Sequence, residues 1–242
     1  MVCATLAAPA AALAGPPFRT DDPEPVDYQH WEFYAFSQAT RVHGDTSGML
    51  PGVEINYGAA PELQLHIIAP LAFAAPSGGG TRFGYGDTEL GVKYRFVDED
   101  VDGWRPQLGV FPLLEVPTGD ERRGLGSGQV DAFIPLWLQK SFGPWTTYGG
   151  GGYWINPGAS NKNYVFLGWL LQRQVTDALA IGGEVFHQTA DVVGGHDTSG
   201  FNLGAVYDFS ENHHLLVSAG RGLQNAPSTN ELSYYLAYQL TF

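Results

Sequence analysis

Residues 86–96 read GDTELGVKYRF, and this stretch carries the clearest structural signal in the chain. Small or apolar residues alternate with charged ones along most of its length. One face would carry Thr88, Leu90, Val92, Tyr94 and Phe96, and the opposite face Asp87, Glu89, Lys93 and Arg95. A period of two is that of a β-strand, because successive side chains of a strand point to opposite faces. The stretch therefore predicts a strand with one apolar face and one wet face.

The same alternation recurs from residue 29 onward, in segments of roughly ten residues separated by turn residues. A tilted strand needs about 9–11 residues to cross a bilayer. No stretch shows the helical spacing i, i+3, i+4, i+7. The predicted strands are 29–39, 49–59, 62–73, 86–96, 104–116, 129–140, 145–156, 163–173, 178–188, 200–209, 213–222 and 231–242. They number about twelve, and single-chain bacterial barrels have an even number of strands.

Composition favours a barrel in a membrane over a soluble sheet. Only 15% of the residues are charged, against about 25% in soluble domains, while aromatic residues reach 13%. A soluble antiparallel sheet buries its apolar face against a second layer, and the sequence predicts no helix to supply one. Closing the sheet in lipid pairs every backbone group and leaves no edge. We therefore expect an all-β fold, a transmembrane antiparallel up-and-down β-barrel of about 12 strands.

The first 28 residues precede the barrel of residues 29–242. Residues 1–14 are small, apolar and uncharged, and Ala12-Leu13-Ala14 fits the rule for signal cleavage before Gly15. We interpret them as a residual signal peptide, with a disordered Ala-rich tail as the alternative. Cys3, the single cysteine, lies within them, so the mature chain would offer no disulfide and no thiolate metal ligand. For residues 15–28, which are Pro-rich and acidic, we expect an unstructured periplasmic lead-in rather than a gate.

The predicted connectors alternate between shorter and longer segments. AAPE, DEDVDG, SFGP, VTDA and SENH are the shorter ones, and RVHGDTSG and VPTGDERRGLGSG are among the longer ones. Barrels of this class have tight periplasmic turns and longer outer loops. We therefore expect a protein of the bacterial outer membrane with both termini on the periplasmic side.

The face opposite Leu90, Val92 and Tyr94 would line the lumen. Charged side chains are costly when they face lipid but not when they face a wet interior, so their shared parity supports a barrel. The predicted charged lining consists of Glu32, Glu54, Asp87, Glu89, Lys93, Arg95, Arg105, Glu115, Asp131, Arg173, Glu184 and Asp208. These residues would form either an ion-pair network that fills the barrel or a lining that selects solutes. The sequence does not separate the two.

Aromatic residues also fall on the inward parity. They are Phe111, Phe133, Trp137, Tyr148, Trp154 and Phe186. An aromatic wall would suit an apolar or aromatic solute, and simple packing or a girdle at the strand ends is an equal alternative. Trp31, Trp104 and Trp145 fall on the lipid parity at strand ends, as in an interfacial aromatic belt.

The charge and the motifs exclude several classes of function. The net charge of −13 argues against nucleic acid as a partner, because phosphate binding needs clustered Lys and Arg. The seven His residues are scattered, with no HxxxH spacing and no nucleophile elbow. The glycine run 149–152 lies in a predicted strand and is no phosphate loop. We expect no enzyme, no cofactor and no metal site.

The last strand, ELSYYLAYQLTF at 231–242, would pair with the first to close the barrel. Its terminal Phe242 resembles the C-terminal signal by which outer-membrane barrels are recognised for insertion. The expected partners are therefore outer-membrane lipid, the barrel assembly machinery and a small-molecule solute.

Three stretches together resemble the outer-membrane "MetA-pathway of phenol degradation" family of β-barrel transporters. They are PPFRTDDPEPVDYQHWEFY (16–34), GYGDTELGVKYRF (84–96) and VPTGDERRGLGSGQVDAFIPLWLQKSFGPW (116–145). The residues that match the family motifs are Thr20, Asp21, Asp22, Pro23, Gly86, Asp87, Pro117, Thr118, Gly119 and Asp120. The resemblance implies a barrel that moves hydrophobic or aromatic compounds across the outer membrane, and it brings no catalytic residues and no role for the matching positions.

The function we expect is a passive outer-membrane channel for small, hydrophobic or aromatic solutes. A non-conducting structural barrel of the envelope is the alternative, and a lipid-acting barrel enzyme is a more distant one.

Overall fold

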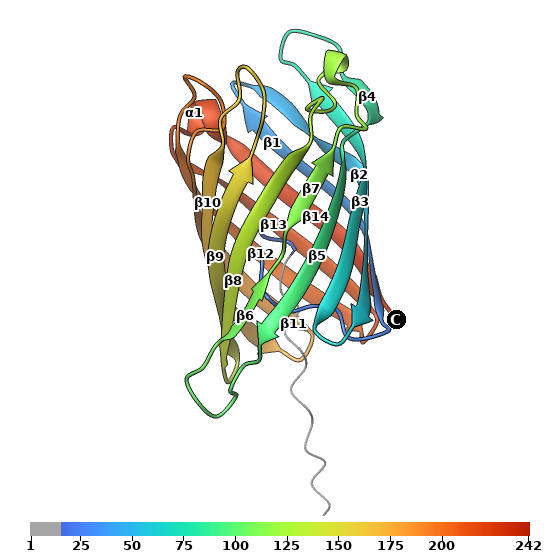
Figure 1. Ribbon diagram of the computed structural model, residues 1–242, viewed down its shortest axis with the longest axis vertical. Helices are drawn as coiled ribbons and strands as arrows, with labels where there is room; N and C mark the ends of the chain where they lie inside the picture. The colour runs from blue at the N-terminus through green and yellow to red at the C-terminus, as the bar shows by residue number, and fades with distance from the viewer. Residues whose placement is uncertain (1–15) are drawn as a thin grey trace, which may run out of the picture.

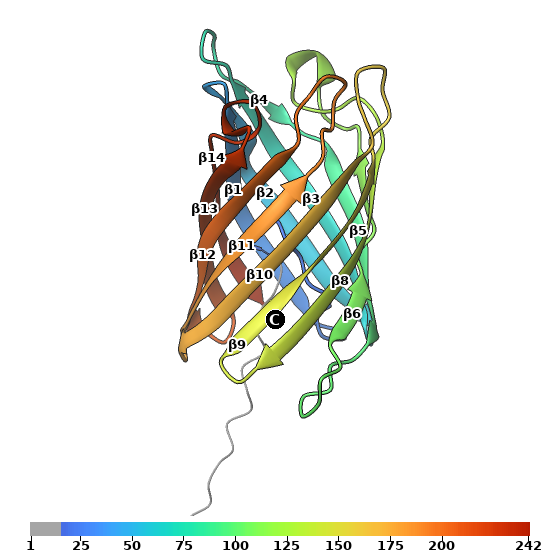
Figure 2. The same cartoon turned by 90° about the vertical axis from the view of Figure 1, so that its left-hand side faces the viewer.

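The computed structural model describes residues 16–242, which form a closed antiparallel β-barrel (Figures 1 and 2). The strands are β1 (Trp31–Val42), β2 (Asp45–Ala60), β3 (Leu63–Ala75), β4 (Arg82–Tyr85), β5 (Thr88–Val97), β6 (Gln107–Val110), β7 (Leu113–Val116), β8 (Asp131–Phe142), β9 (Trp145–Ile155), β10 (Tyr164–Thr176), β11 (Leu179–Gln188), β12 (Thr198–Ser210), β13 (His213–Gln224) and β14 (Leu232–Thr241). Two short helical turns, η1 (Glu121–Arg123) and α1 (Ala226–Thr229), lie in loops.

The fourteen segments make twelve barrel strands, because β4 and β5 together form one strand and β6 and β7 together form another. β4 and β5 both pair with β3, and β6 and β7 both pair with β5 and β8. The second interruption falls at Phe111 and Pro112, and proline has no N–H to donate to a neighbouring strand. The predicted number of strands is therefore confirmed.

The first and last strands close the barrel as the sequence predicts. β1 pairs with β14 from Glu32–Thr241 to Arg41–Leu232. Trp31 and Phe242 add two backbone hydrogen bonds at the end, of 2.7 and 3.0 Å. Since every neighbouring pair is antiparallel and β3 joins β5, the sheet has no free edge in the described chain.

Large apolar side chains cover the outer face. On β5, Leu90, Val92, Tyr94 and Phe96 are 40, 38, 46 and 47% exposed, whereas Lys93 between them is 4% exposed. A soluble protein rarely exposes so continuous an apolar surface, and lipid is the environment that suits it. Trp31 and Trp145 begin their strands on this outer face, and Trp104 is exposed in the loop before β6. Among residues 16–242, no helix is long and apolar enough to cross a membrane.

Two connectors differ from the expectation. The segment RVHGDTSG is a tight turn of His43 and Gly44, because β1 and β2 extend through most of it. Both turn residues have positive φ, of 51° and 80°, as the favoured two-residue hairpin turn requires. Conversely, residues 98–106, expected as a short turn, form a nine-residue loop that projects from the end at which β14 finishes (Figure 1).

The internal segment, which we define as residues 16–27, is the main departure from the sequence prediction. It runs inside the barrel and leads to β1 at the end where the C-terminus lies (Figure 1). The expectation of an unstructured lead-in for 15–28 is therefore wrong, because Thr20 and Asp22 are fully buried against the barrel wall. The predicted signal peptide, residues 1–14, lies outside the described residues.

Candidate functional site in the barrel lumen

Glu184 on β11 holds the internal segment at one side of the lumen. The backbone N–H groups of Arg19 and Thr20 donate to its carboxylate at 2.9 and 2.7 Å, and the Thr20 hydroxyl donates at 2.6 Å. Asn202 on β12 donates to the same carboxylate. A buried carboxylate needs such donors to offset the loss of its hydration. Glu184 therefore ties residues 19 and 20 to the wall.

Lys93 on β5 holds the segment at the opposite side. Its Nζ lies 2.9 Å from Asp21 Oδ1 and 3.6 Å from Asp22 Oδ1, and all but a small part of its side chain is buried. A buried cation is tolerated only when it is paired in this way. Lys93 and Glu184 thus attach consecutive residues of the segment to two separate walls.

Arg95 extends the same arrangement toward the terminal end of the barrel. It forms ion pairs with Glu24 at 2.6 Å and Asp98 at 3.1 Å, and also with Glu62. The second carboxylate oxygen of Glu24 accepts from Gln107 Nε2 at 2.6 Å. The acidic residues of the segment are therefore used as partners for lumen cations and amides.

Glycines in the strands allow the segment to lie close to the wall. A Cβ at Gly168 would stand 2.1 Å from Thr20 Oγ1, and one at Gly58 would stand 1.9 Å from the carbonyl oxygen of Asp27. At Gly109 the corresponding distance to Pro23 Cβ is 2.9 Å. A strand glycine often marks such a close approach of another backbone. The barrel wall and the segment are therefore shaped to each other.

The remaining charged side chains of the lumen lie mainly on β1–β8. His66 on β3 lies between two carboxylates, with Nε2 2.9 Å from Glu89 Oε1 and Nδ1 3.6 Å from Glu54 Oε1. Glu115 stands opposite both Glu89 and Asp131 in the strand register. Near the terminal end, Glu32 accepts from the Tyr34 hydroxyl at 2.7 Å, and Asp208 lies 2.6 Å from His214 Nδ1.

Aromatic side chains line the wall formed by β8–β11. Phe133 stacks on Trp154 with ring centroids 4.8 Å apart, and Trp154 stacks on Tyr164 at 5.7 Å. These three rings stand opposite one another in the strand register. Trp137, Phe166 and Phe186 continue the wall along the barrel axis, and all three are buried. We call this group the aromatic wall.

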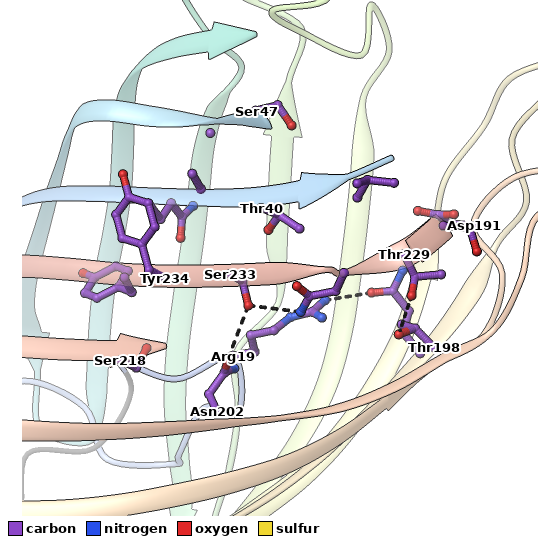
Figure 3. A pocket seen from close by; sticks show the side chains of 18 of the residues that line it. Arg19, Thr40, Ser47, Asp191, Thr198, Asn202, Ser218, Thr229, Ser233 and Tyr234 are labelled. Atoms are coloured by element: carbon purple, nitrogen blue, oxygen red, sulfur yellow. Dashed lines mark hydrogen bonds between the residues drawn. The ribbon is translucent and has the colours of Figure 1, made fainter. Parts of the chain in front are cut away.

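The lumen holds three cavities around the internal segment. The loop-end cavity, of about 600 Å³, is lined by the segment and by polar side chains of β12–β14 and their loops (Figure 3). The aromatic cavity, of about 310 Å³, lies in front of the aromatic wall. The terminal-end cavity, of about 640 Å³, is lined by Asp27, Trp31, Asp208, His214 and Phe242 among others. It shares no lining residue with the other two, and residues of the internal segment line all three.

Most residues predicted for the lumen lie on the inner face, and the exceptions have local causes. Arg105 is exposed in the 98–106 loop, where its Nε donates to the Asp98 carbonyl, so its assignment to the lumen is wrong. Arg173 points outward with its guanidinium over the Trp145 ring, and that assignment is also wrong. Tyr148 and Phe111 are buried inside as expected.

The second group of motif residues belongs to a loop rather than to the lumen. Asp87, predicted as lumen lining, accepts hydrogen bonds from the backbone N–H groups of Gly119 and Ser127. Thr118 Oγ1 accepts from Thr88 N and donates to the Gly86 carbonyl, each at 2.9 Å. Asp120 precedes η1, and its carbonyl accepts from Arg123 and Leu125. Pro117 is exposed. The motif therefore holds the 117–130 loop against the β4–β5 junction.

Sequence reasoning missed several lumen residues, among them His66, Tyr164, Phe166 and Arg19. His66 follows the alternation of β3, since Gln64 and His66 are buried between the exposed Leu65 and Ile67, and the parity could have identified it. Tyr164 and Phe166 lie on a strand that is apolar on both faces, so the sequence gives no phase. Arg19 has no periodic context. Among the described residues, no group of His, Cys, Asp and Glu is arranged to hold a metal ion.

Comparison with known proteins gives a family and a fold. The model of the family described as "Putative MetA-pathway of phenol degradation" matches residues 31–240. No curated protein sequence matches the chain.

Among solved structures, the COG4313 outer membrane channel from Pseudomonas putida F1 superposes with a TM-score of 0.73 at 17% identity, covering 90% of this chain and 99% of that one. The NanC porin gives 0.62 at 6% identity over 86% and 98% of the two chains. The KdgM porin gives 0.56 at 11% identity over 88% and 99%. At these identities the likeness concerns the fold, which is that of outer-membrane channels and porins rather than of an enzyme.

Proposed function

The chain belongs to the MetA-pathway of phenol degradation family, and on that premise we propose that it is an outer-membrane channel for small hydrophobic or aromatic solutes. Transport is diffusion down a gradient through the lumen, with no coupled energy source. The observation that carries the proposal is a closed barrel with an apolar outer face and solvent-sized cavities inside it.

The internal segment sets a condition on this function. It is anchored to Lys93 and Arg95 on one wall and to Glu184 on another, so a solute that crosses the lumen has to pass it. The segment is held by hydrogen bonds and ion pairs that are largely buried, so it leaves the wall only when water replaces these partners. The channel is therefore one that opens intermittently.

The same segment favours a second candidate function, a non-conducting barrel of the envelope. Thr20, Asp22 and Pro23 are fully buried within the lumen, and a segment that never leaves would seal the barrel permanently. The two candidates share the fold and differ only in the motion of residues 16–27.

The proposed location is the bacterial outer membrane, with lipid around the apolar face. Both chain termini are proposed to lie on the periplasmic side. The C-terminal strand with Phe242 is proposed to engage the barrel assembly machinery, since Phe242 is exposed at the end of β14.

Single-channel recording separates the two candidates. The full chain, folded in detergent and inserted into planar bilayers, is expected to show brief openings of small conductance. The control is the same detergent without protein. A folded barrel that gives no current above this control, and no uptake of phenol faster than into protein-free liposomes, supports the sealed barrel and removes the channel.

A further inference from the structure

Arg19 stands at the junction of two cavities. Together with Gln38, Tyr164 and Gln188 it lines both the loop-end cavity and the aromatic cavity. Figure 3 shows it reaching from the internal segment among side chains of β12 and β14, including Asn202 and Ser233. A solute that passes from the loop-end cavity to the aromatic cavity therefore meets this guanidinium.

The guanidinium of Arg19 forms no ion pair within 4 Å among the described residues, unlike Lys93 and Arg95, although Glu184 and Asp191 lie near enough to act on it electrostatically. Lys93 pairs with Asp21, and Arg95 pairs with Glu24. The Arg19 side chain instead donates to Gln188 Oε1 at 2.8 Å and lies over the rings of Phe166 and Phe186, 5.2 and 4.4 Å from their centroids. A guanidinium carries five N–H donors, so most remain available to a ligand.

The aromatic cavity next to Arg19 fits one aromatic ring. Its volume of about 310 Å³ exceeds the roughly 150 Å³ of an engineered cavity that binds benzene. Phe133, Trp137 and Trp154 line it. Aromatic rings prefer offset-stacked or edge-to-face contacts with one another, which a planar ligand can make here and a saturated one cannot.

The two carboxylates that line the aromatic cavity are already paired. Asp21 lies 2.9 Å from Lys93 Nζ, and Glu89 lies 2.9 Å from His66 Nε2. An amine would find these acids engaged and the Phe166 and Phe186 faces occupied by Arg19. An anion would find the unpaired guanidinium, whose fork matches a carboxylate through two parallel hydrogen bonds.

We propose that the aromatic cavity and Arg19 form a binding site for a small aromatic anion, a single ring that carries a carboxylate. The ring lies against the aromatic wall, and the carboxylate accepts hydrogen bonds from Arg19 at the junction with the loop-end cavity. This inference rests on the proposed function, because it names the class of solute that the channel would bind during transport.

Equilibrium binding tests the site directly. Benzoate, phenol, benzylamine and cyclohexanecarboxylate are titrated calorimetrically, at neutral pH and low salt, into the full chain folded in detergent. Benzoate is expected to bind about tenfold or more tightly than phenol or benzylamine, because a charge-assisted hydrogen bond adds about that much. It is expected to bind several-fold more tightly than cyclohexanecarboxylate, because only the aromatic ring stacks. Equal affinity for benzoate and benzylamine would overturn the proposal.

Two variants locate the interaction. Arg19→Gln is expected to lower benzoate affinity at least tenfold and to leave phenol affinity within about twofold. Trp154→Leu is expected to weaken both ligands by a similar factor, since it removes an aromatic side chain that lines the cavity for both. The matched control is Arg122→Gln, in the exposed η1 turn away from both cavities. Unchanged benzoate binding in Arg19→Gln contradicts the assignment even when the protein folds normally.

The channel proposal and the binding-site proposal can be refuted separately. Benzoate binding without any solute flux into liposomes leaves the site in place and removes the channel. Flux without a preference for benzoate over benzylamine, or without sensitivity to Arg19→Gln, leaves the channel in place and removes the site.

Discussion

On the side of β3–β6 the inner wall of the barrel is charged, and the internal segment lies against it through Lys93, Arg95 and Gln107. On the side of β8–β11 the wall is aromatic, and a cavity of about 310 Å³ lies in front of it. The charged wall finds its partners in Asp21, Asp22 and Glu24 of the segment. The aromatic side chains need no ionic partner, so a cavity can remain beside them. The anchor of the segment on this side of the barrel is Glu184 on β11, which accepts from the backbone of residues 19 and 20.

This difference assigns separate tasks to the two walls. Charged groups buried in a lumen require partners, and the internal segment supplies them at the cost of obstructing the barrel. Aromatic side chains require only contact with one another, which stacking provides. The charged wall would then control opening, and the aromatic wall would control which solute is held. Four predictions test the division, from the largest expected effect to the smallest.

Removing the internal segment should have the largest effect. A refolded chain that begins at Tyr28 lacks the whole internal segment but keeps its anchors Lys93, Arg95 and Glu184. We expect its mean conductance in planar bilayers to rise several-fold over that of the full chain, with longer openings. The full chain refolded in the same way is the control. Equal conductance would show that the segment is not the obstruction.

Replacing Lys93 by Met should release the segment without shortening the chain. The substitution leaves Asp21 and the fully buried Asp22 without their cation, and an uncompensated buried charge costs about 3–5 kcal/mol. We expect faster amide hydrogen exchange at residues 18–24 and openings that approach those of the shortened chain. Lys162→Met, at an exposed loop position, is the matched control and should change neither quantity. Full protection of residues 18–24 in Lys93→Met would contradict the role of the charged wall.

The sequence predicts the wall of this barrel far better than its contents. Alternation such as that of Leu90, Val92 and Tyr94 arises because one face of each strand contacts lipid and the other faces the lumen. The strand 164–176 is the exception, because Phe166 and Leu170 inside and Leu167 and Leu171 outside are equally apolar. The wrong assignment of Arg173 to the lumen follows from that ambiguity.

The internal segment could not be predicted for a different reason. Its contacts join residues far apart in the sequence, such as Asp21 with Lys93 at 72 positions and Thr20 with Glu184 at 164 positions. No periodic pattern within residues 16–27 records such partners. The sequence does contain the residues that pair in the structure. The segment carries the acids, one strand carries Lys93 and Arg95, and glycines lie where the segment comes close to the wall. Arg105 was misplaced because the strand was expected to begin at 104, whereas β6 begins at Gln107.

Adding a single methyl group at Gly168 should loosen the segment on the Glu184 side. A Cβ there would stand 2.1 Å from Thr20 Oγ1, so the segment or the strand must shift. Such overpacking typically costs about 1–3 kcal/mol. We expect Gly168→Ala to increase hydrogen exchange at residues 19 and 20 and the frequency of openings, by less than Lys93→Met does. Gly78→Ala, where nothing lies within 4 Å of the added atom, should be neutral. If both alanines behave alike, the close approach of Thr20 has no part in holding the segment.

Changing the aromatic wall should have the smallest effect on opening, and this asymmetry is the sharpest test of the division. Trp154→Leu removes the stacking with Phe133 and Tyr164, and an aromatic pair contributes about 0.5–1.5 kcal/mol beyond its buried area. Since two such pairs are lost, we expect the free energy of guanidinium unfolding in detergent to fall by about 1–3 kcal/mol. Trp104→Leu, whose side chain is 87% exposed, is the unshifted control. The frequency of openings and the exchange of residues 18–24 should stay at the values of the full chain, because no contact that anchors the segment involves Trp154. An increase in openings comparable to that of Lys93→Met would mean that both walls hold the segment, and the separation of opening from solute binding would no longer stand.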